Sequence, residues 1–345
     1  MNVYRLLRFI GIGRIPDSLK VFGVWLMYVS RRRMAAVFID PVMACNLRCR
    51  MCYFSDPEKR ASMSGTMADE ELDQLERSML PYAVKMQIGC GAEPTLYGRL
   101  VELVERGKRC GVPYISLTTN GQLLASGRVR IGDLVEAGLD EITLSMHGTD
   151  ARTYEYLMPG AKFEMLKKLI SDIAEIRKRG LKLSVRVNFT VNNMNMRNLE
   201  GNGFWQLWDD AGILPDIVQL RPVQRIGDSD WSDFDLEPLK EHFDATIGNV
   251  VRRCREEKIV CIAPTAAALD EVATDREAVG AIIEDVVYCY VSPGTVYKPD
   301  FDRLHDTFYT YNKKHHTGWH LFKTIFRRGR RSRPRGSKKL NYTVR

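Results

Sequence analysis

The sequence lacks a long hydrophobic run. The apolar stretch near its start, residues 21–29, covers nine positions, about half of the roughly 20 that a membrane-crossing helix needs. Three arginines follow at residues 31–33, where a secretory signal would carry small residues for cleavage. We therefore expect a helix that lies in the core or against a surface rather than across a membrane, and a cytoplasmic protein.

The sequence also lacks the dense, regular cysteine spacing of a small secreted scaffold. Its eight cysteines in 345 residues favour a reducing compartment in which thiols persist or bind metal, and disulfides are less favoured. Hydrophobic residues make up 45% of the chain and charged residues 27%. This composition is typical of a globular protein and excludes a disordered or fibrous one.

The middle of the chain lacks the positive charge that the chain as a whole carries. Residues 1–33 hold seven Lys or Arg and one Asp, residues 313–345 hold twelve and no acid, and residues 34–312 hold 32 basic and 42 acidic residues. Phosphate binding needs basic side chains spread over a folded face, so we expect no nucleic-acid partner. Basic ends are typical of segments that contact an anionic surface, which predicts peripheral membrane contact through the termini.

Short apolar runs alternate with amphipathic stretches from residue 35 onward, as in repeated strand–helix units. Six strands are predicted, at residues 35–40, 83–88, 115–119, 141–145, 182–191 and 217–223. Parallel strands joined by helices connect right-handedly. The predicted fold class is therefore α/β, a partial, open (β/α)6 TIM-type barrel with a short C-terminal extension. Functional groups should gather at the carboxyl ends of its strands.

This pattern divides the chain into four segments. Residues 1–33 form a basic, apolar N-terminal segment, and residues 34–258 form the barrel domain, whose last helix is predicted from about residue 236 to 258. Residues 259–326 break the strand–helix repeat. Residues 327–345 are basic and too poor in apolar residues to fold alone, which predicts a disordered tail.

Cys45, Cys49 and Cys52 form a C-x3-C-x2-C loop directly after the first predicted strand. Three thiolates in one short loop can bind three corners of a [4Fe-4S] cluster and leave the fourth iron without a protein ligand, which opens that iron to chemistry. Zinc is a weaker alternative, because it usually takes four ligands and no second cysteine pair lies nearby in the sequence. Buried thiols without a ligand role are the remaining alternative.

The loop resembles the cysteine motif of the radical S-adenosylmethionine (SAM) superfamily, including the aromatic Tyr53 after the last cysteine. The resemblance covers residues 35–227. It implies an enzyme with a [4Fe-4S] cluster whose open iron is chelated by the amino and carboxylate groups of SAM, while the backbone of Tyr53 contacts the adenine. It also implies that the cluster, reduced by a flavodoxin- or ferredoxin-type electron donor, passes one electron to the sulfonium. Methionine is then released, and a 5′-deoxyadenosyl radical takes hydrogen from the substrate.

Gly91-Ala92-Glu93-Pro94, after the second predicted strand, resembles the G-G-E-P motif of the same superfamily. A carboxylate and backbone carbonyls at this place can accept hydrogen bonds from the SAM ammonium, and small residues permit a close approach. Ala92 stands where the family usually has a second glycine, which predicts a tighter site. The alternative is a plain strand-to-helix turn with Pro94 near a helix start.

Weaker matches lie at later strands. Asn120 belongs to a Thr-Asn-Gly turn after the third strand, and Ser145 ends the fourth, where family members use a serine for SAM contacts. Asn188 and Arg221, on the fifth and sixth strands, are candidate SAM or substrate contacts, although such residues can simply satisfy local hydrogen bonds. His147 is a candidate proton shuttle because imidazole titrates near neutral pH, and a turn residue is the more ordinary interpretation.

The remaining cysteines do not repeat the motif. Cys254 falls on the apolar face of the last predicted helix, and Cys90 and Cys110 are expected to be buried packing residues. Cys261 and Cys289 are isolated, and two thiolates do not easily hold a cubane.

Residues 288–297 and 318–326 resemble the SPASM extension of peptide-modifying radical SAM enzymes, although most of its cysteines are missing. Residues 259–326 are therefore interpreted as a degenerate SPASM-like region, which suggests a peptide or protein substrate. The basic, apolar N-terminus instead suggests a lipid or lipid-linked glycan. Two rival functions stay open: an iron–sulfur electron carrier or redox-sensing binding protein on the same fold, and a zinc-stabilised interaction protein. Glu93 argues against a carrier, which needs no site for the SAM amine.

Overall fold

Residues 17–223, 233–266, 269, 285–326 and 343–344 are described by the computed structural model of the chain. In this part, ten strands form one sheet in the order β10-β7-β6-β5-β4-β3-β2-β1-β8-β9. Their bounds are β1 Ala35–Ile39, β2 Ala83–Ile88, β3 Ile115–Thr119, β4 Glu141–Ser145, β5 Ser184–Val191, β6 Ile217–Pro222, β7 Val260–Ala263, β8 Tyr288–Ser292, β9 Thr295–Val296 and β10 Thr343–Val344. All neighbours from β7 to β8 are parallel, and β9 and β10 are antiparallel to their neighbours.

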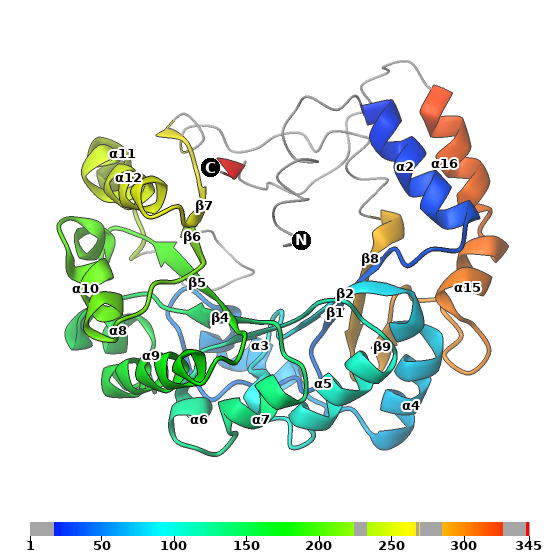
Figure 1. Ribbon diagram of the computed structural model, residues 1–345, viewed down its shortest axis with the longest axis horizontal. Helices are drawn as coiled ribbons and strands as arrows, with labels where there is room; N and C mark the ends of the chain where they lie inside the picture. Colours follow the sequence, from blue (N-terminus) through cyan, green and yellow to red (C-terminus); the bar gives the residue numbers. More distant parts are fainter. Residues whose placement is uncertain (1–16, 224–232, 267–268, 270–284, 327–342, 345) are drawn as a thin grey trace.

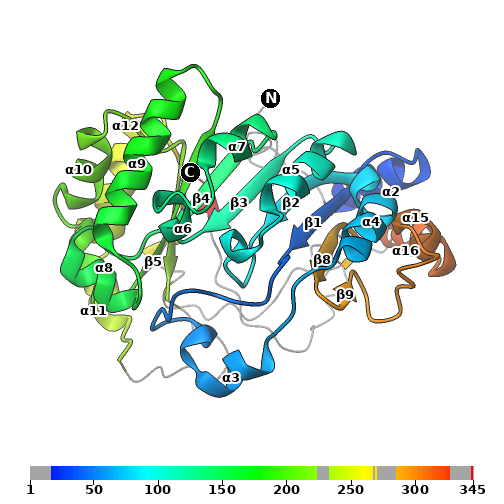
Figure 2. The same cartoon turned by 90° about the horizontal axis from the view of Figure 1, so that it is seen from below.

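The sheet curves into an open trough, and helices cover its outer side (Figure 1, Figure 2). The α-helices are α2 Asp17–Val29, α3 Pro57–Ser62, α4 Asp69–Ser78, α5 Leu100–Arg109, α6 Gln122–Ala125, α7 Ile131–Glu136, α8 Ala151–Leu157, α9 Phe163–Lys178, α10 Gly203–Asp210, α11 Glu237–Glu241, α12 Asn249–Glu256, α15 Phe308–Lys314 and α16 Thr317–Phe326. Short 3-10 turns are η1 Tyr53–Ser55, η2 Leu80–Tyr82, η3 Pro94–Leu96 and η4 Met196–Leu199, and η5 Asp244–Gly248 is a π-helical turn.

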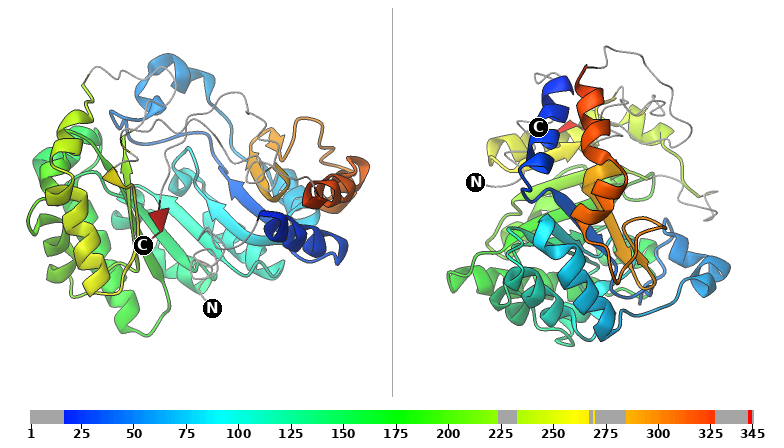
Figure 3. Two further views of the ribbon diagram at one scale, coloured as in Figure 1. Left: turned by 90° about the horizontal axis from the view of Figure 1, so that it is seen from above. Right: turned by 90° about the vertical axis from the view of Figure 1, so that its right-hand side faces the viewer.

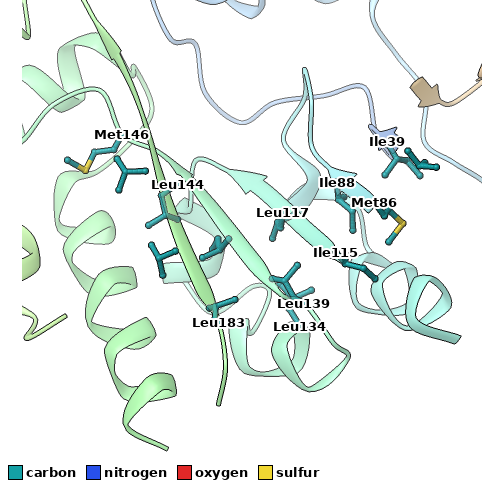
Figure 4. Packing of buried hydrophobic residues seen from close by; sticks show 14 of the residues in the cluster. Ile39, Met86, Ile88, Ile115, Leu117, Leu134, Leu139, Leu144, Met146 and Leu183 are labelled. Atoms are coloured by element: carbon teal, nitrogen blue, oxygen red, sulfur yellow. The ribbon is translucent and has the colours of Figure 1, made fainter. Parts of the chain in front are cut away.

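Apolar residues at alternate strand positions pack toward the helices. Ile39, Ile88, Leu117 and Leu144, one from each of β1 to β4, are buried in a single hydrophobic cluster (Figure 4). Burying a side chain of this size stabilises the fold by about 1.5–3 kcal/mol relative to leaving it exposed. Because side chains alternate along a strand, polar positions between them, such as Ser145, face the inner side of the trough.

The six predicted strands are β1 to β6, in order and within two residues at either end. The sheet order is linear, and among the described strands the edges β9 and β10 do not pair with each other. The prediction of a partial, open TIM-type barrel is therefore confirmed.

The sheet continues beyond the six predicted strands. β7 adds a parallel strand beside β6, and β8 adds one beside β1, where Val37 pairs with Cys289. Two residues of the predicted disordered tail form β10 against β7, because a free sheet edge offers unpaired N–H and C=O groups. Residues 327–342 and 345 of that tail, and residues 1–16 of the predicted N-terminal segment, lie outside the described part.

The helix predicted from residue 236 to 258 is interrupted. It divides into α11, the π-helical turn η5 and α12. Within η5 the hydroxyl of Thr246 donates to the carbonyl of His242 at 2.8 Å and to that of Phe243 at 3.2 Å. Such bonds from a hydroxyl to the preceding turn bend a helix, and an apolar stripe in the sequence does not reveal them.

Candidate active site

The three cysteines of the C-x3-C-x2-C loop follow β1 and are half-buried free thiols. Leu47 and Met51, which lie between them, are buried. The N–H of Cys52 donates to the carbonyl of Cys49 at 2.9 Å. The loop is therefore a compact turn held by its own apolar positions.

Main-chain bonds hold this loop against the end of α8. The N–H groups of Arg48 and Arg50 donate to the carbonyls of Pro159 and Leu157, each at 3.0 Å. The guanidinium of Arg48 donates to the carbonyl of Cys45 at 2.7 Å. A main chain fixed in this way sets the spacing of the thiols before any ligand binds.

Burial raises the pKa of all three thiols, to about 11 for Cys45. The charges of Cys52 and Cys45 raise the pKa of Cys49 further, and Glu93 acts on Cys45 and Cys49 in the same direction. The three thiols therefore lie within electrostatic range of one another, and thiolates placed in this way repel one another unless a cation binds between them. A [4Fe-4S] cluster fits this donor set, because thiolates are its usual ligands.

A site for a single ion is a separate question. Within the described ranges, no group of three or more His, Cys, Asp or Glu side chains is arranged to hold one metal ion. Each thiolate of a cubane binds a different iron atom. This finding therefore concerns a mononuclear site and not a cluster.

Asp40, the residue after β1, organises the loop that follows β2. Its buried carboxylate accepts hydrogen bonds from the N–H groups of Cys90 at 2.7 Å, Gly91 at 3.0 Å and Ala92 at 3.3 Å. The Tyr290 hydroxyl on β8 donates to the same carboxylate at 2.8 Å. Asp40 and Tyr290 are not among the predicted site residues. An acid directly after a buried apolar strand was a usable signal, since a buried carboxylate needs partners.

Tyr53 contacts the same loop through its side chain. Its hydroxyl donates to the carbonyl of Gly91 at 2.7 Å. A β-carbon on Gly91 would lie 2.3 Å from that hydroxyl oxygen, so only glycine permits this approach. The Tyr53 side chain therefore holds the loop after β2 in place. This role is additional to the contact between the Tyr53 backbone and the SAM adenine that the resemblance implies.

The carboxylate of Glu93 is buried and already surrounded by donors. Oε1 accepts from the Thr95 N–H at 3.1 Å and from the Thr119 hydroxyl at 2.7 Å, and Oε2 accepts from the Asn120 N–H at 2.8 Å. Burial raises the pKa of Glu93, and these hydrogen bonds oppose the rise. Glu93 fastens the loop after β2 to the end of β3. These donors all belong to the protein, and the prediction that this carboxylate accepts from the SAM ammonium stays a prediction.

Asn120 links the end of β3 to the cysteine loop. Its side-chain N–H donates to Oδ1 of Asn46 at 2.8 Å, and its own Oδ1 accepts from the N–H of Gln122 at 3.0 Å. Asn46 lies between Cys45 and Cys49. It is a third supporting residue that the sequence did not single out, since an asparagine in a loop carries no specific local signal.

Ser145 on β4 and Asn188 on β5 are register partners in adjacent strands. Oδ1 of Asn188 is buried and has no hydrogen-bond partner in the described part of the chain. Leaving a buried acceptor unsatisfied costs about 1–3 kcal/mol. The ammonium and ribose hydroxyls of SAM are donors of the kind that this acceptor lacks.

His147 does not have the properties of a proton shuttle. Its Nδ1 accepts from the N–H of Thr190 at 3.1 Å, and burial lowers the pKa of the ring to about 4. The imidazole is therefore neutral near pH 7 and engaged with the backbone. Arg221, the candidate on β6, is exposed and lies opposite Thr190. Burial lowers the pKa of the Arg186 guanidinium, and the nearby charge of Arg221 lowers it further.

The other cysteines differ in part from expectation. Cys254 is buried, as predicted, but its thiol contacts that of Cys261, so Cys261 is not isolated. Cys90 is exposed rather than buried, and Cys110 is half-buried. Cys289 is buried on β8.

The predicted SPASM-like stretches have ordinary structural roles in the described part. Residues 288–297 contribute β8 and β9, and residues 318–326 belong to α16. The SPASM resemblance itself stays a prediction. Among the described helices, none combines the length and apolar character needed to cross a membrane.

The family model of the radical SAM superfamily matches residues 39–199. A protein named "Probable GTP 3',8-cyclase" from Pyrococcus abyssi is 27% identical over 254 residues, 71% of this chain and 75% of that protein. Proteins of the same name are 32% identical in Methanococcus maripaludis, over 61% of this chain and 66% of that protein, and 28% identical in Sulfurisphaera tokodaii, over 52% of this chain. The chain spans about half the length of the last relative, 54%.

A solved structure shares the fold. The crystal structure of Streptococcus suis SuiB bound to S-adenosylmethionine aligns with a TM-score of 0.53 at 14% identity, over 77% of this chain and 60% of SuiB. With the family model and the relatives, this fold places the chain in a known class of enzyme. The chain belongs to the radical SAM superfamily, whose cofactors are a [4Fe-4S] cluster and SAM.

Proposed function

We propose that this protein is a radical SAM enzyme whose cluster is held by Cys45, Cys49 and Cys52. The observation that supports the proposal is the compact turn after β1, which carries three half-buried thiols within eight residues and in which the charges of Cys45 and Cys52 raise the pKa of Cys49. When bound there, the cluster and SAM supply a 5′-deoxyadenosyl radical for hydrogen abstraction. A reduced flavodoxin- or ferredoxin-type protein is the proposed electron donor.

The protein's own residues position these groups. Tyr53 and the loop of Gly91 and Ala92 form the side of the site that receives the SAM methionyl and adenine groups. Glu93 and Pro94 hold that loop in place, since the Glu93 carboxylate binds donors from β3. We assign Glu93 as a positioning residue on this basis.

Three further residues complete the proposed SAM site. Asn120 carries the support from the end of β3 to the cysteine loop through Asn46. Ser145 and Asn188 offer a hydroxyl and an unsatisfied acceptor to the SAM ribose or ammonium. An acceptor that gains a donor on binding contributes about 0.5–1.5 kcal/mol per neutral hydrogen bond.

The inner side of the trough favours a polar substrate. The Ser116 hydroxyl donates to Gln87 at 3.3 Å, and Arg186 forms an ion pair with Glu141 at 3.1 Å. With Arg221 exposed on β6, the wall offers hydrogen bonds and one exposed cation rather than an apolar lining. Such a surface binds a polar or anionic group better than a hydrocarbon chain.

A nucleotide is the substrate candidate that the curated relatives favour, because their names specify GTP. It matches the polar, partly cationic wall of the trough. The relatives give no support to a peptide, lipid or glycan substrate. Anaerobic incubation with GTP should raise 5′-deoxyadenosine formation above the substrate-free rate if a purine nucleotide is used. If GTP neither binds nor raises 5′-deoxyadenosine formation, the proposal of a nucleotide substrate is wrong. The proposal of a radical SAM enzyme does not depend on this result.

The enzyme class has its own test. Protein reconstituted anaerobically with iron and sulfide, then reduced with dithionite in the presence of SAM, should release 5′-deoxyadenosine and methionine. Cys45→Ser should abolish both products, whereas Cys110→Ser, at a half-buried thiol directly after α5, should leave them unchanged. A protein that binds iron and SAM but never cleaves SAM would instead be an electron carrier or a redox-sensing binding protein. A colourless protein that carries zinc would be an interaction module.

A further inference from the structure

Large hydrophobic side chains are exposed mainly on α2 and α16. Ten such side chains are exposed in the described part of the chain, and seven of them belong to these two helices: Leu19, Phe22, Leu26, Met27, Val29, Trp319 and Phe326. The other three, Tyr156, Tyr288 and Leu304, come from separate segments. Single exposed hydrophobic residues are normal on a soluble protein, but a contiguous group marks a contact site.

The helix α2 is apolar on two opposite faces. Val21 and Val24 are buried, with Trp25 and Tyr28 half-buried beside them. The exposed residues Leu19, Phe22, Leu26 and Val29 recur at intervals of three and four, which places them on one side of the helix. A helix that is apolar all round is normally covered all round, and no described residue covers the outer face of α2.

The helix α16 extends this face. It lies beside α2 at one corner of the molecule, away from the parallel sheet (Figure 1; right-hand view of Figure 3). The rings of Trp25 and Phe322 have centroids 5.6 Å apart. A β-carbon on Gly318 would lie 2.7 Å from the ring of Tyr28, so this glycine lets the helices approach closely. Trp319 and Phe326 then continue the exposed apolar surface of α2.

Positive charge surrounds this apolar face. Arg31 and Arg32, directly after α2, are exposed, and the exposed Lys323 lies over the Trp319 ring at 4.8 Å. Asp17 is the single acid in the sequence of α2, and the sequence of α16 has none. Beyond Phe326 the sequence continues with eight Lys or Arg in residues 327–342. The surface therefore combines aromatic and aliphatic side chains with cations at its rim.

We propose that this α2–α16 face docks on a lipid surface that carries anionic headgroups. Apolar side chains enter the boundary between headgroups and acyl chains, and the rim cations contact the headgroups, as in interfacial amphipathic helices. Trp319 suits this boundary because its ring is amphipathic. With 13 and 10 residues, α2 and α16 are far shorter than the roughly 20 residues of a spanning helix, so they lie along the surface.

Charge decides against a second copy of the chain as the occupant. A two-fold interface places the same patch against itself. Arg31, Arg32 and Lys323 of one copy would then meet a patch of the same positive charge on the other, and juxtaposed like charges oppose association. An anionic lipid surface is complementary to both the apolar centre and the cationic rim. The inference does not depend on the radical chemistry.

Vesicle sedimentation of the full chain tests the proposal. Wild-type protein should bind phosphatidylcholine vesicles that contain phosphatidylglycerol, and pure phosphatidylcholine vesicles more weakly. The double variant Phe22→Ser/Leu26→Ser should bind the anionic vesicles about tenfold more weakly or worse, because two inserted side chains are lost. Leu304→Ser is the matched control: it removes a side chain that is 61% exposed elsewhere and should change nothing. Thermal unfolding of each variant reports its folding.

Two results would overturn the proposal. The first is equal vesicle binding by wild type and Phe22→Ser/Leu26→Ser, measured at about 0.5 M salt so that the basic termini are screened. The second is a wild-type dimer in solution that the double variant dissociates, which would assign the face to a second copy. Should the double variant fail to fold, quenching of Trp319 by brominated lipid decides instead. On these vesicles the wild type must then lose tryptophan fluorescence, and the Trp319→Phe variant must lose less.

Discussion

The side chain of Asn120, after β3, donates a 2.8 Å hydrogen bond to Oδ1 of Asn46 inside the cysteine loop. This bond joins two segments that are 74 residues apart. Together with the bonds from Glu93 to Thr119 and Asn120, it makes the cysteine loop, the loop after β2 and the end of β3 one connected unit. The proposed cluster ligands and the proposed SAM contacts are therefore positioned by the same network.

The Asn46–Asn120 bond should slow loss of the cluster. Asn46→Ala removes the acceptor without touching a thiol, at a cost of about 1 kcal/mol for a hydrogen bond of this kind. We expect reconstituted Asn46→Ala to release iron to a chelator several-fold faster than wild type under anaerobic conditions. The double variant Asn46→Ala/Asn120→Ala should release iron no faster than Asn120→Ala. Additive effects would show that the two residues act separately.

Replacement of Glu93 by glutamine should destabilise the fold and not only weaken SAM binding. In the wild type three donors face the Glu93 carboxylate, and the glutamine amide would turn its own N–H groups toward them. A broken buried hydrogen bond to a charged group costs about 1.5–3 kcal/mol. Urea unfolding of the apoprotein measures this loss. Glu175→Gln, at an exposed pair with Lys178, is the control and should cost less than about 0.5 kcal/mol. Unchanged stability of Glu93→Gln would contradict the positioning role.

Gly91→Ala should weaken SAM binding through Tyr53. The new methyl group would lie 2.3 Å from the Tyr53 hydroxyl, so the ring must move and the bond to the Gly91 carbonyl breaks. Gly98→Ala is a matched control, since nothing lies within 4 Å of its β-carbon. Tyr53→Phe removes the clashing oxygen, so Gly91→Ala/Tyr53→Phe should bind SAM better than Gly91→Ala alone. Calorimetric titration with SAM compares the variants, and an absent rescue would refute the close approach.

Stability should fall as pH decreases from 6.5 toward 4 because of His147. Burial lowers the folded-state pKa of this ring from 6.5 to about 4, so in this window the unfolded chain binds a proton that the folded protein does not. The full linkage amounts to about 3 kcal/mol, as each pKa unit is worth about 1.4 kcal/mol. His147→Gln keeps an acceptor for the Thr190 N–H and should show a shallower slope in urea unfolding between pH 4 and 6.5. Equal slopes would mean that His147 is protonated in the folded state.

The parts predicted from sequence are those with local signals. β1 to β6 are buried parallel strands, which produce apolar runs of strand length. The cysteine loop is recognised by the spacing of its three cysteines. The missing parts depend on contacts between distant segments. Tyr290 donates a hydrogen bond to Asp40 from 250 positions away in the sequence. The residues beside either one do not indicate that the two are partners. The hydrogen bonds to the Glu93 carboxylate could not be predicted either, because the donors at the end of β3 are polar side chains and N–H groups of an ordinary turn.

The central claim is that Cys45, Cys49 and Cys52 hold a cubane with one iron open to SAM. Electron paramagnetic resonance of the reduced, reconstituted protein tests it most directly, with and without SAM. We expect about four irons per chain, a reduced-cluster signal that changes its g-values when SAM is added, and no such signal in the triple Cys→Ser variant. A signal that SAM leaves unchanged, or one that survives the loss of all three cysteines, would contradict the account.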